Sequence, residues 1–455
     1  MKKVKSNKLG KRIFSIVLTT ALVLGLMPGN VLTVSAEESI TTAQNVTAFA
    51  TPEQLMSGDC FALHADTGSG VAQKVYFGTN GSNKQTWYIA GSDAADSIVL
   101  LCDPMLPLAT GKVFEDSTAN KTYDDNWGCT YDSAPSEVYP NHYGASDLRG
   151  VLQGYTSNDN TEKFSAVEKE LMQSTKVYTD DDKRKDEGET DYTYYTEDVL
   201  YPAYGDYDDD QYITVGANRA DSLNGGLKVS LKSAPYNSGD IFWVRAPYYD
   251  ISDIALVAAP GYYVCATHDV SNEHSVVPAF RLNLSSVLFA SAATAATSDA
   301  SLTDTMTFRV DGTEKIKSKA AYTTCGVTVN DDEGDGNVFL YVQDADSVYS
   351  VEITEDTTLA LSDMTGINNL TDENTKIWLE KSEDNVAYAV MAEALLTEHI
   401  SNADDGDCTT AITCSICGTV TAEAKENHID DNGDQRGQAS FRRMRSSSYK
   451  RKCCQ

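Results

Sequence analysis

Short, wholly apolar runs constrain this chain more than any other feature of its sequence. Ile98–Cys102 (IVLLC) has five apolar residues without polar alternation, which is typical of a strand buried on both faces. Comparable runs predict further strands over residues 86–90, 241–246, 261–267 and 276–284. We therefore expect a domain with a sheet over residues 57–290.

Two helices are expected between these strands. Ser146 is suited to cap a helix, and apolar residues follow with helical spacing from Leu148 to Tyr155. Ser165 and Glu168 form a capping-box pattern for a second helix. Because strands and short helices alternate with long loops and not as βαβ units, the sequence predicts an α+β domain.

Five motifs occur in order within this domain: Trp87-Tyr-Ile-Ala90, Ser146-Asp-Leu-Arg149, Phe164-Ser-Ala-Val-Glu168, Phe242-Trp-Val-Arg-Ala-Pro247 and Val277-Pro-Ala-Phe280. The series resembles a family of domains of unknown function in secreted and surface proteins of Gram-positive bacteria. The resemblance implies a C-type-lectin-like fold for about half of the chain. The calcium-binding loops of C-type lectins do not occur in the sequence, so their sugar chemistry does not follow.

We expect the motif residues to be structural: Trp87, Asp147, Arg149, Trp243, Arg245, Pro278 and Phe280. Trp243 and Arg245 lie on one face of a strand because side chains alternate along it. They form either a binding platform or a core tryptophan with an arginine that fixes a loop, and the second interpretation is favoured.

Tyrosines are the candidate ligand-binding residues, because tyrosine combines a flat apolar face with a hydroxyl group. The acidic segment 178–212 is rich in them, and others follow predicted strands or precede them. The alternative for the acidic segment is a charged surface loop with half-buried tyrosines. The candidates are Tyr192, Tyr194, Tyr195, Tyr207, Tyr248, Tyr249 and Tyr262.

Charge excludes one large class of partner. Residues 37–434 carry 23 basic and 67 acidic residues, and the whole chain has a net charge of −31. Contacts with phosphates need clustered Lys and Arg, so this balance argues against a nucleic-acid partner. Signatures of nucleophilic, zinc-protease or nucleotide-binding enzymes do not occur, and we expect no catalytic residues.

Residues 1–36 have the pattern of a signal peptide. Six positive charges precede an apolar run of fifteen residues, Ile13–Met27, and Val34-Ser35-Ala36 matches a cleavage site. An uncleaved anchor is the alternative. We expect a secreted or extracellular protein that can associate with the cell wall. After cleavage it is not an integral membrane protein.

A second, all-β domain is expected over residues 305–392. Short alternating stretches there resemble the strands of a small β-sandwich. Residues 291–304 (SAATAATSDASLTD) are small or polar apart from one leucine, which indicates a linker.

Cysteines mark the C-terminal part as a candidate metal site. Cys414-x-x-Cys417 is half of a zinc site, to which Cys408 and His428 can contribute. A disulfide or a disordered partial repeat is the alternative. Residues 400–434 resemble part of a cysteine-containing repeat of Gram-positive surface proteins. The basic tail 435–455 is either a surface-binding or disordered segment or the product of a frameshift.

Calcium is the other candidate ion. Asp206, Asp208 and Asp210, and separately Asp331 to Asp335, have the carboxylate spacing of calcium loops. The closing glutamate is missing from both, so solvated turns are the alternative.

These patterns together predict a secreted or cell-surface binding or adhesion-type module for a glycan or protein. The alternatives are a structural surface protein and an enzyme acting on wall or host glycans.

Overall fold

The computed structural model describes residues 48–57, 73–131, 133–180, 193–205, 212–216, 227–232, 238–261, 263–294, 300–395, 411–414, 416–418, 420–422, 428–429 and 435–436. The expected signal peptide, residues 1–36, and residues 437–455 of the basic tail lie outside the described residues. About half of the described residues are in strands.

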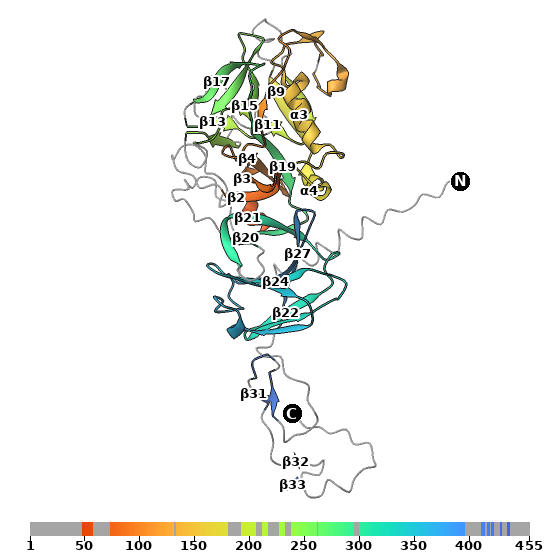
Figure 1. Ribbon diagram of the computed structural model, residues 1–455, viewed down its shortest axis with the longest axis vertical. Helices are drawn as coiled ribbons and strands as arrows, with labels where there is room; N and C mark the ends of the chain where they lie inside the picture. Colours follow the sequence, from red (N-terminus) through yellow and green to blue (C-terminus); the bar gives the residue numbers. More distant parts are fainter. Residues whose placement is uncertain are drawn as a thin grey trace, which may run out of the picture. The chain divides into compact units, whose positions relative to one another are not determined.

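The largest sheet has thirteen strands and contains segments from both predicted domains. Its main path runs β11-β19-β4-β3-β2-β21-β28-β27-β24-β25, and Figure 1 labels most of these strands. β21 is parallel to both of its neighbours on this path, β2 and β28. The strands are β1 (Phe49–Ala50), β2 (Lys74–Asn80), β3 (Asn83–Ala94), β4 (Ser97–Cys102), β8 (Met172–Gln173), β11 (Tyr201–Pro202), β19 (Pro278–Asn283), β20 (Val287–Thr294), β21 (Ser301–Asp311), β24 (Val338–Gln343), β25 (Val348–Ile353), β27 (Lys376–Glu383) and β28 (Val386–Met391).

Smaller sheets contain the remaining strands. The five-stranded sheet has β5 (Ala109–Lys112), β15 (Phe242–Pro247), β16 (Ile254–Ala259), β17 (Tyr263–Asp269) and β18 (His274–Val276). The four-stranded sheet has β22 (Lys319–Thr323), β23 (Gly326–Asn330), β26 (Thr357–Ala360) and β29 (Glu393–Ala394). The three-stranded sheet has β12 (Tyr204–Gly205), β13 (Tyr212–Thr214) and β14 (Lys228–Ser230). The paired strands are β6 (Lys121–Thr122) with β7 (Glu137–Val138), β9 (Thr175–Asp180) with β10 (Thr193–Asp198), β30 (Ile412–Thr413) with β31 (Val420–Ala422), and β32 (His428–Ile429) with β33 (Gln435–Arg436).

Helices are few and short in the described part of the chain. They are α2 (Pro52–Met56), α3 (Asp147–Thr156) and α4 (Ala166–Leu171), with 3-10 turns η2 (Asp125–Trp127), η3 (Tyr143–Ala145) and η4 (Leu361–Asp363). Ser146 caps α3, and Ser165 with Glu168 forms the capping box of α4, so both predicted helices are confirmed. None of the described helices has the length and apolar character needed to span a membrane.

The predicted α+β, C-type-lectin-like fold is wrong. The two helices are correct, but strands fill much of what was expected to be loop, and the described chain is mainly β-sheet. The paired strands β9 and β10, for example, extend into the acidic, tyrosine-rich segment 178–212. Thr and Tyr favour strands even where charge suggests a loop.

Residues 291–304 also differ from the expected linker. Residues 291–294 belong to β20 and 301–304 to β21, which pair with each other. The small side chains of this segment allow close packing around Arg309. The Arg309 guanidinium donates to the carbonyls of Ser291 and Ala293, both at 2.7 Å. Strands do occur throughout residues 305–392, but they divide between the thirteen-stranded sheet and the four-stranded sheet, whose strands were not predicted. One hydrophobic core extends from Ala50 to Tyr388.

Candidate functional site

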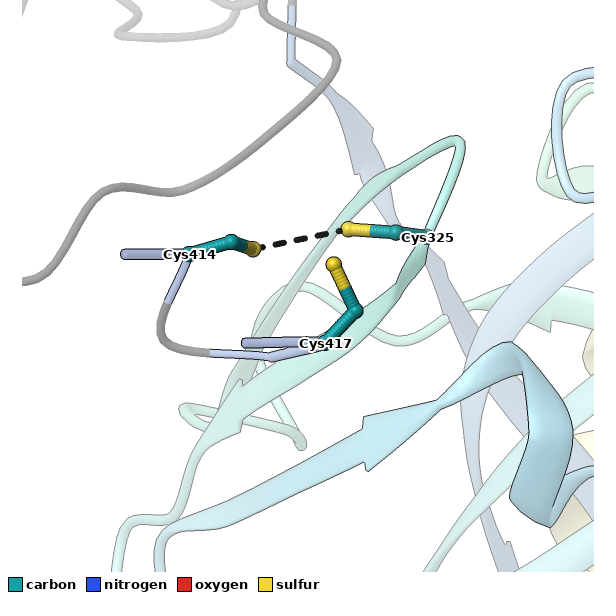
Figure 2. Close-up of side chains that lie close together, drawn as sticks. All are labelled: Cys325, Cys414 and Cys417. Atoms are coloured by element: carbon teal, nitrogen blue, oxygen red, sulfur yellow. Dashed lines mark hydrogen bonds between the residues drawn. The ribbon is translucent and has the colours of Figure 1, made fainter. Parts of the chain in front are cut away.

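Three cysteine side chains from distant parts of the sequence meet at one point. Cys325 lies in the turn between β22 and β23, while Cys414 and Cys417 lie in the turn between β30 and β31. Figure 2 shows the three sulfurs directed toward one another. The sulfurs all lie within 4.8 Å of one another, and the Sγ atoms of Cys325 and Cys414 are 3.7 Å apart. This is the one group of three or more His, Cys, Asp or Glu side chains in the described part of the chain that is able to hold a metal ion.

Backbone hydrogen bonds shape the turn that carries two of these cysteines. The Ile416 N–H donates to Cys414 Sγ at 3.4 Å, and the Gly418 N–H donates to the Cys414 carbonyl at 3.0 Å. Gly418 has φ of 72°, a left-handed conformation that glycine adopts without steric cost. The turn therefore brings Cys414 and Cys417 to the same side.

The thiols differ in acidity. Burial raises the pKa of Cys414, but hydrogen bonds from the N–H groups of Cys417 and Ile416 and from the neighbouring thiols outweigh it and lower the pKa to about 7. Burial raises the pKa of Cys325 to about 11. Cys414 is therefore the first of the pair to become a thiolate, the form that binds metals.

Sequence reasoning found two of these three residues. Cys414 and Cys417 were candidates, whereas Cys325 was missed because it is distant in sequence. Cys408 lies outside the described residues, as does the side chain of His428. A local signal was available: Cys325 and Cys417 are both followed by glycine, Gly326 and Gly418.

The calcium-like segment around Asp335 is a turn that is held by hydrogen bonds from the backbone of residues 317–318. The Asp335 carboxylate accepts hydrogen bonds from the N–H groups of Lys317 and Ser318, at distances of 2.6–2.8 Å. These bonds lower its pKa despite the opposing effect of burial. The carboxylate is thus already engaged. The segment with Asp206, Asp208 and Asp210 lies outside the described residues.

Of the tyrosines expected to bind a ligand, Tyr194 is buried and Tyr195 is half-buried. The Tyr194 ring stacks on His142 with ring centroids 4.2 Å apart, and its hydroxyl accepts a hydrogen bond from the Gly144 N–H. Lys176 lies over the ring of Tyr195 at 4.4 Å. Three other candidates, Tyr192, Tyr207 and Tyr262, lie outside the described residues.

Tyr248 and Tyr249 lie in the loop between β15 and β16, where Tyr248 is half-buried and Tyr249 is exposed. Their ring centroids are 5.0 Å apart, and Tyr249 and Ile251 are 42% and 46% exposed. The buried Asn141 amide donates to the carbonyls of Tyr248, Ile251 and Ile254 at 3.0–3.3 Å. One side chain thus fixes the backbone on both sides of the exposed residues. The importance of Asn141 has no evident signal in the sequence.

Most of the family-motif residues lie in the core. Trp87, Trp243, Pro278 and Phe280 are buried, and the Trp243 indole N–H donates to the Lys112 carbonyl at 2.8 Å.

The two motif arginines are also buried and fix neighbouring segments. Arg149 pairs with Asp198 at 2.9 Å, and Arg245 donates to the carbonyls of Tyr178, Pro202 and Gly216. Asp147 is exposed and accepts a hydrogen bond from the Asp116 N–H. These contacts are those of residues that position the backbone.

Comparison of the chain with family models, with curated proteins and with solved structures gave no match.

Proposed function

We propose that this chain is an extracellular binding module that recognises a glycan or protein through the loop of residues 248–251. The main support is the combination of exposed apolar side chains, Tyr249 and Ile251, with a backbone fixed by Asn141. A loop that is already rigid loses little conformational entropy when a ligand binds. Tyrosine adds a rigid apolar surface and a polar hydroxyl, which suits recognition of either ligand class.

The N-terminal pattern of the sequence supports secretion, as expected for an extracellular binding module. The burial of a cysteine thiol favours binding over catalysis. Burial raises the pKa of Cys129 to about 12, so this thiol is protonated and a poor nucleophile near neutral pH.

We also propose zinc as the ion for the cysteine cluster, with a structural role. Thiolates are soft ligands that favour zinc, whereas calcium takes oxygen ligands. Cys325, Cys414 and Cys417 supply three ligands of a tetrahedral site, and a water molecule or a further side chain completes it.

Arrays of glycans and of extracellular proteins, probed with the labelled whole chain, test the binding proposal. We expect binding that falls about tenfold or more in the double variant Tyr249→Ala, Ile251→Ala, because exposed anchors dominate interface energies. Met391→Ala is the matched control, since Met391 is 43% exposed but lies on β28. Equal binding by the loop variant and wild type, or no binding by folded protein, would contradict the proposal.

A further inference from the structure

We propose that the cysteine cluster is a zinc clasp that fastens the segment of residues 411–422 to the turn between β22 and β23. The clasp rests on the zinc site proposed above and adds a consequence for the chain: metal occupancy decides whether this C-terminal segment is attached to the four-stranded sheet.

The spacing of the sulfurs carries the first step. A zinc–sulfur bond of about 2.3 Å in a tetrahedral site places two sulfurs roughly 3.8 Å apart. The Sγ atoms of Cys325 and Cys414 are 3.7 Å apart. A disulfide would need about 2.05 Å, so the spacing fits two ligands of one ion and does not fit a disulfide bond.

Hydrogen bonds to the sulfurs of Cys414 and Cys325 orient these side chains for metal binding. The Ile416 N–H points at Cys414 Sγ, and the Thr323 hydroxyl lies 3.1 Å from Cys325 Sγ. Such donors orient metal-bound thiolates and stabilise their charge.

The surroundings of the cluster show why metal is needed for attachment. Besides the sulfurs, the Ile416 side chain contacts Gly326. The contact is close, because a Cβ atom added at Gly326 would lie 2.4 Å from Ile416 Cγ2. Ile416 is itself only partly buried and Cys417 is exposed, so the apolar contact is small. Because 89 residues separate Cys325 from Cys414, joining them closes a long loop, and a metal bond supplies the free energy that this contact lacks.

Two measurements on the whole chain, purified under reducing conditions, test the clasp. Elemental analysis should give one zinc per chain, and Cys325→Ser should lose it although Cys414 and Cys417 remain. Hydrogen exchange of residues 411–422 should increase by about tenfold or more when a chelator removes the zinc, while exchange in β15 and β16 stays unchanged. Cys129→Ala is the matched control: it removes a buried thiol outside the cluster and should leave both results as in wild type.

The outcomes separate the clasp from the proposals on which it stands. Zinc that binds without affecting exchange of residues 411–422 would overturn the clasp and leave the zinc site. Reduced protein that takes up no zinc, or a disulfide in place of the ion, would overturn both. Ligand binding by the 248–251 loop is measured independently on the arrays.

Discussion

At the scale of single residues, Arg309 shows how a buried charge is balanced. Its guanidinium is 1% exposed and pairs with Glu380 at 3.0 Å, while the Trp378 indole N–H donates to the same carboxylate at 2.9 Å. Nη1 and Nη2 of the guanidinium donate to backbone carbonyls of β20 and β21. Glu380 therefore satisfies two buried donors at once.

Removing this carboxylate should destabilise the protein strongly. We expect Glu380→Ala to lower the free energy of unfolding by about 3–5 kcal/mol, because it leaves Arg309 buried without a counter-charge. Urea unfolding measures the change. Glu383→Ala is the control: Glu383 pairs with Lys315 at 2.9 Å on the surface, and its removal should have little effect. Equal losses in the two variants would show that burial of the ion pair is unimportant.

His274 should make stability depend on pH. Burial, and secondarily the charge of His268, lower its pKa from 6.5 to about 4. The unfolded state takes up a proton below about pH 6.5 and the folded state only below about pH 4. This contribution to stability is therefore complete above about pH 6.5 and is lost as the pH falls toward 4.

The corresponding variant is His274→Gln. We expect wild type to lose about 1 kcal/mol more than this variant between pH 7 and pH 5, a value reduced for the partial exposure of the ring. Urea unfolding at the two pH values measures it. A loss as large in His274→Gln as in wild type would refute the assignment.

At the scale of elements, the start of α3 depends on one hydroxyl group. Ser146 Oγ accepts a hydrogen bond from the Arg149 N–H and donates to the Tyr143 carbonyl at 2.7 Å. We expect Ser146→Ala to cost about 1–2 kcal/mol of unfolding free energy, because it removes the N-cap. Ser157→Ala, at the exposed end of the same helix, should change it by less than about 0.5 kcal/mol. Comparable costs in chemical denaturation would mean that the cap is dispensable.

Elements with a simple hydrophobic pattern could be predicted from the sequence. β4 covers the predicted residues 98–102, and α3 begins directly after its predicted cap. β10 was missed because its inward positions include Thr196 and Asp198. These polar groups bond to each other at 2.6 Å, and Asp198 also pairs with Arg149, so the strand buries polar groups without an apolar pattern. Such burial depends on distant partners, which local sequence does not reveal.

The same limit applied to the candidate sites. Cys414-x-x-Cys417 is a local motif and could be found, whereas Cys325 reaches it only through the fold. Tyr249 was a candidate because it follows a strand, but the Asn141 side chain that fixes its loop comes from a segment more than 100 residues earlier.

At the scale of the whole molecule, the shared sheet makes the two predicted domains interdependent. β21 pairs with β2 on one side and β28 on the other, and both halves contribute to one core. We expect a single cooperative transition in calorimetry of the whole chain. A fragment ending at residue 300, which lacks β21, should not fold on its own. Two separate transitions, or a folded fragment, would show independent domains.

The pairing of β2 with β21 also sets an order of events during synthesis. Lys74 pairs with Thr305, and Gln343 donates to the Ala48 carbonyl across 295 residues, so early strands find their partners late. Closing such long loops before any contact forms makes folding slow. Until residues beyond 301 emerge, β2 presents an open edge to other chains, which is a common route to aggregation. Efficient production of this protein therefore depends on protecting its nascent first half from self-association.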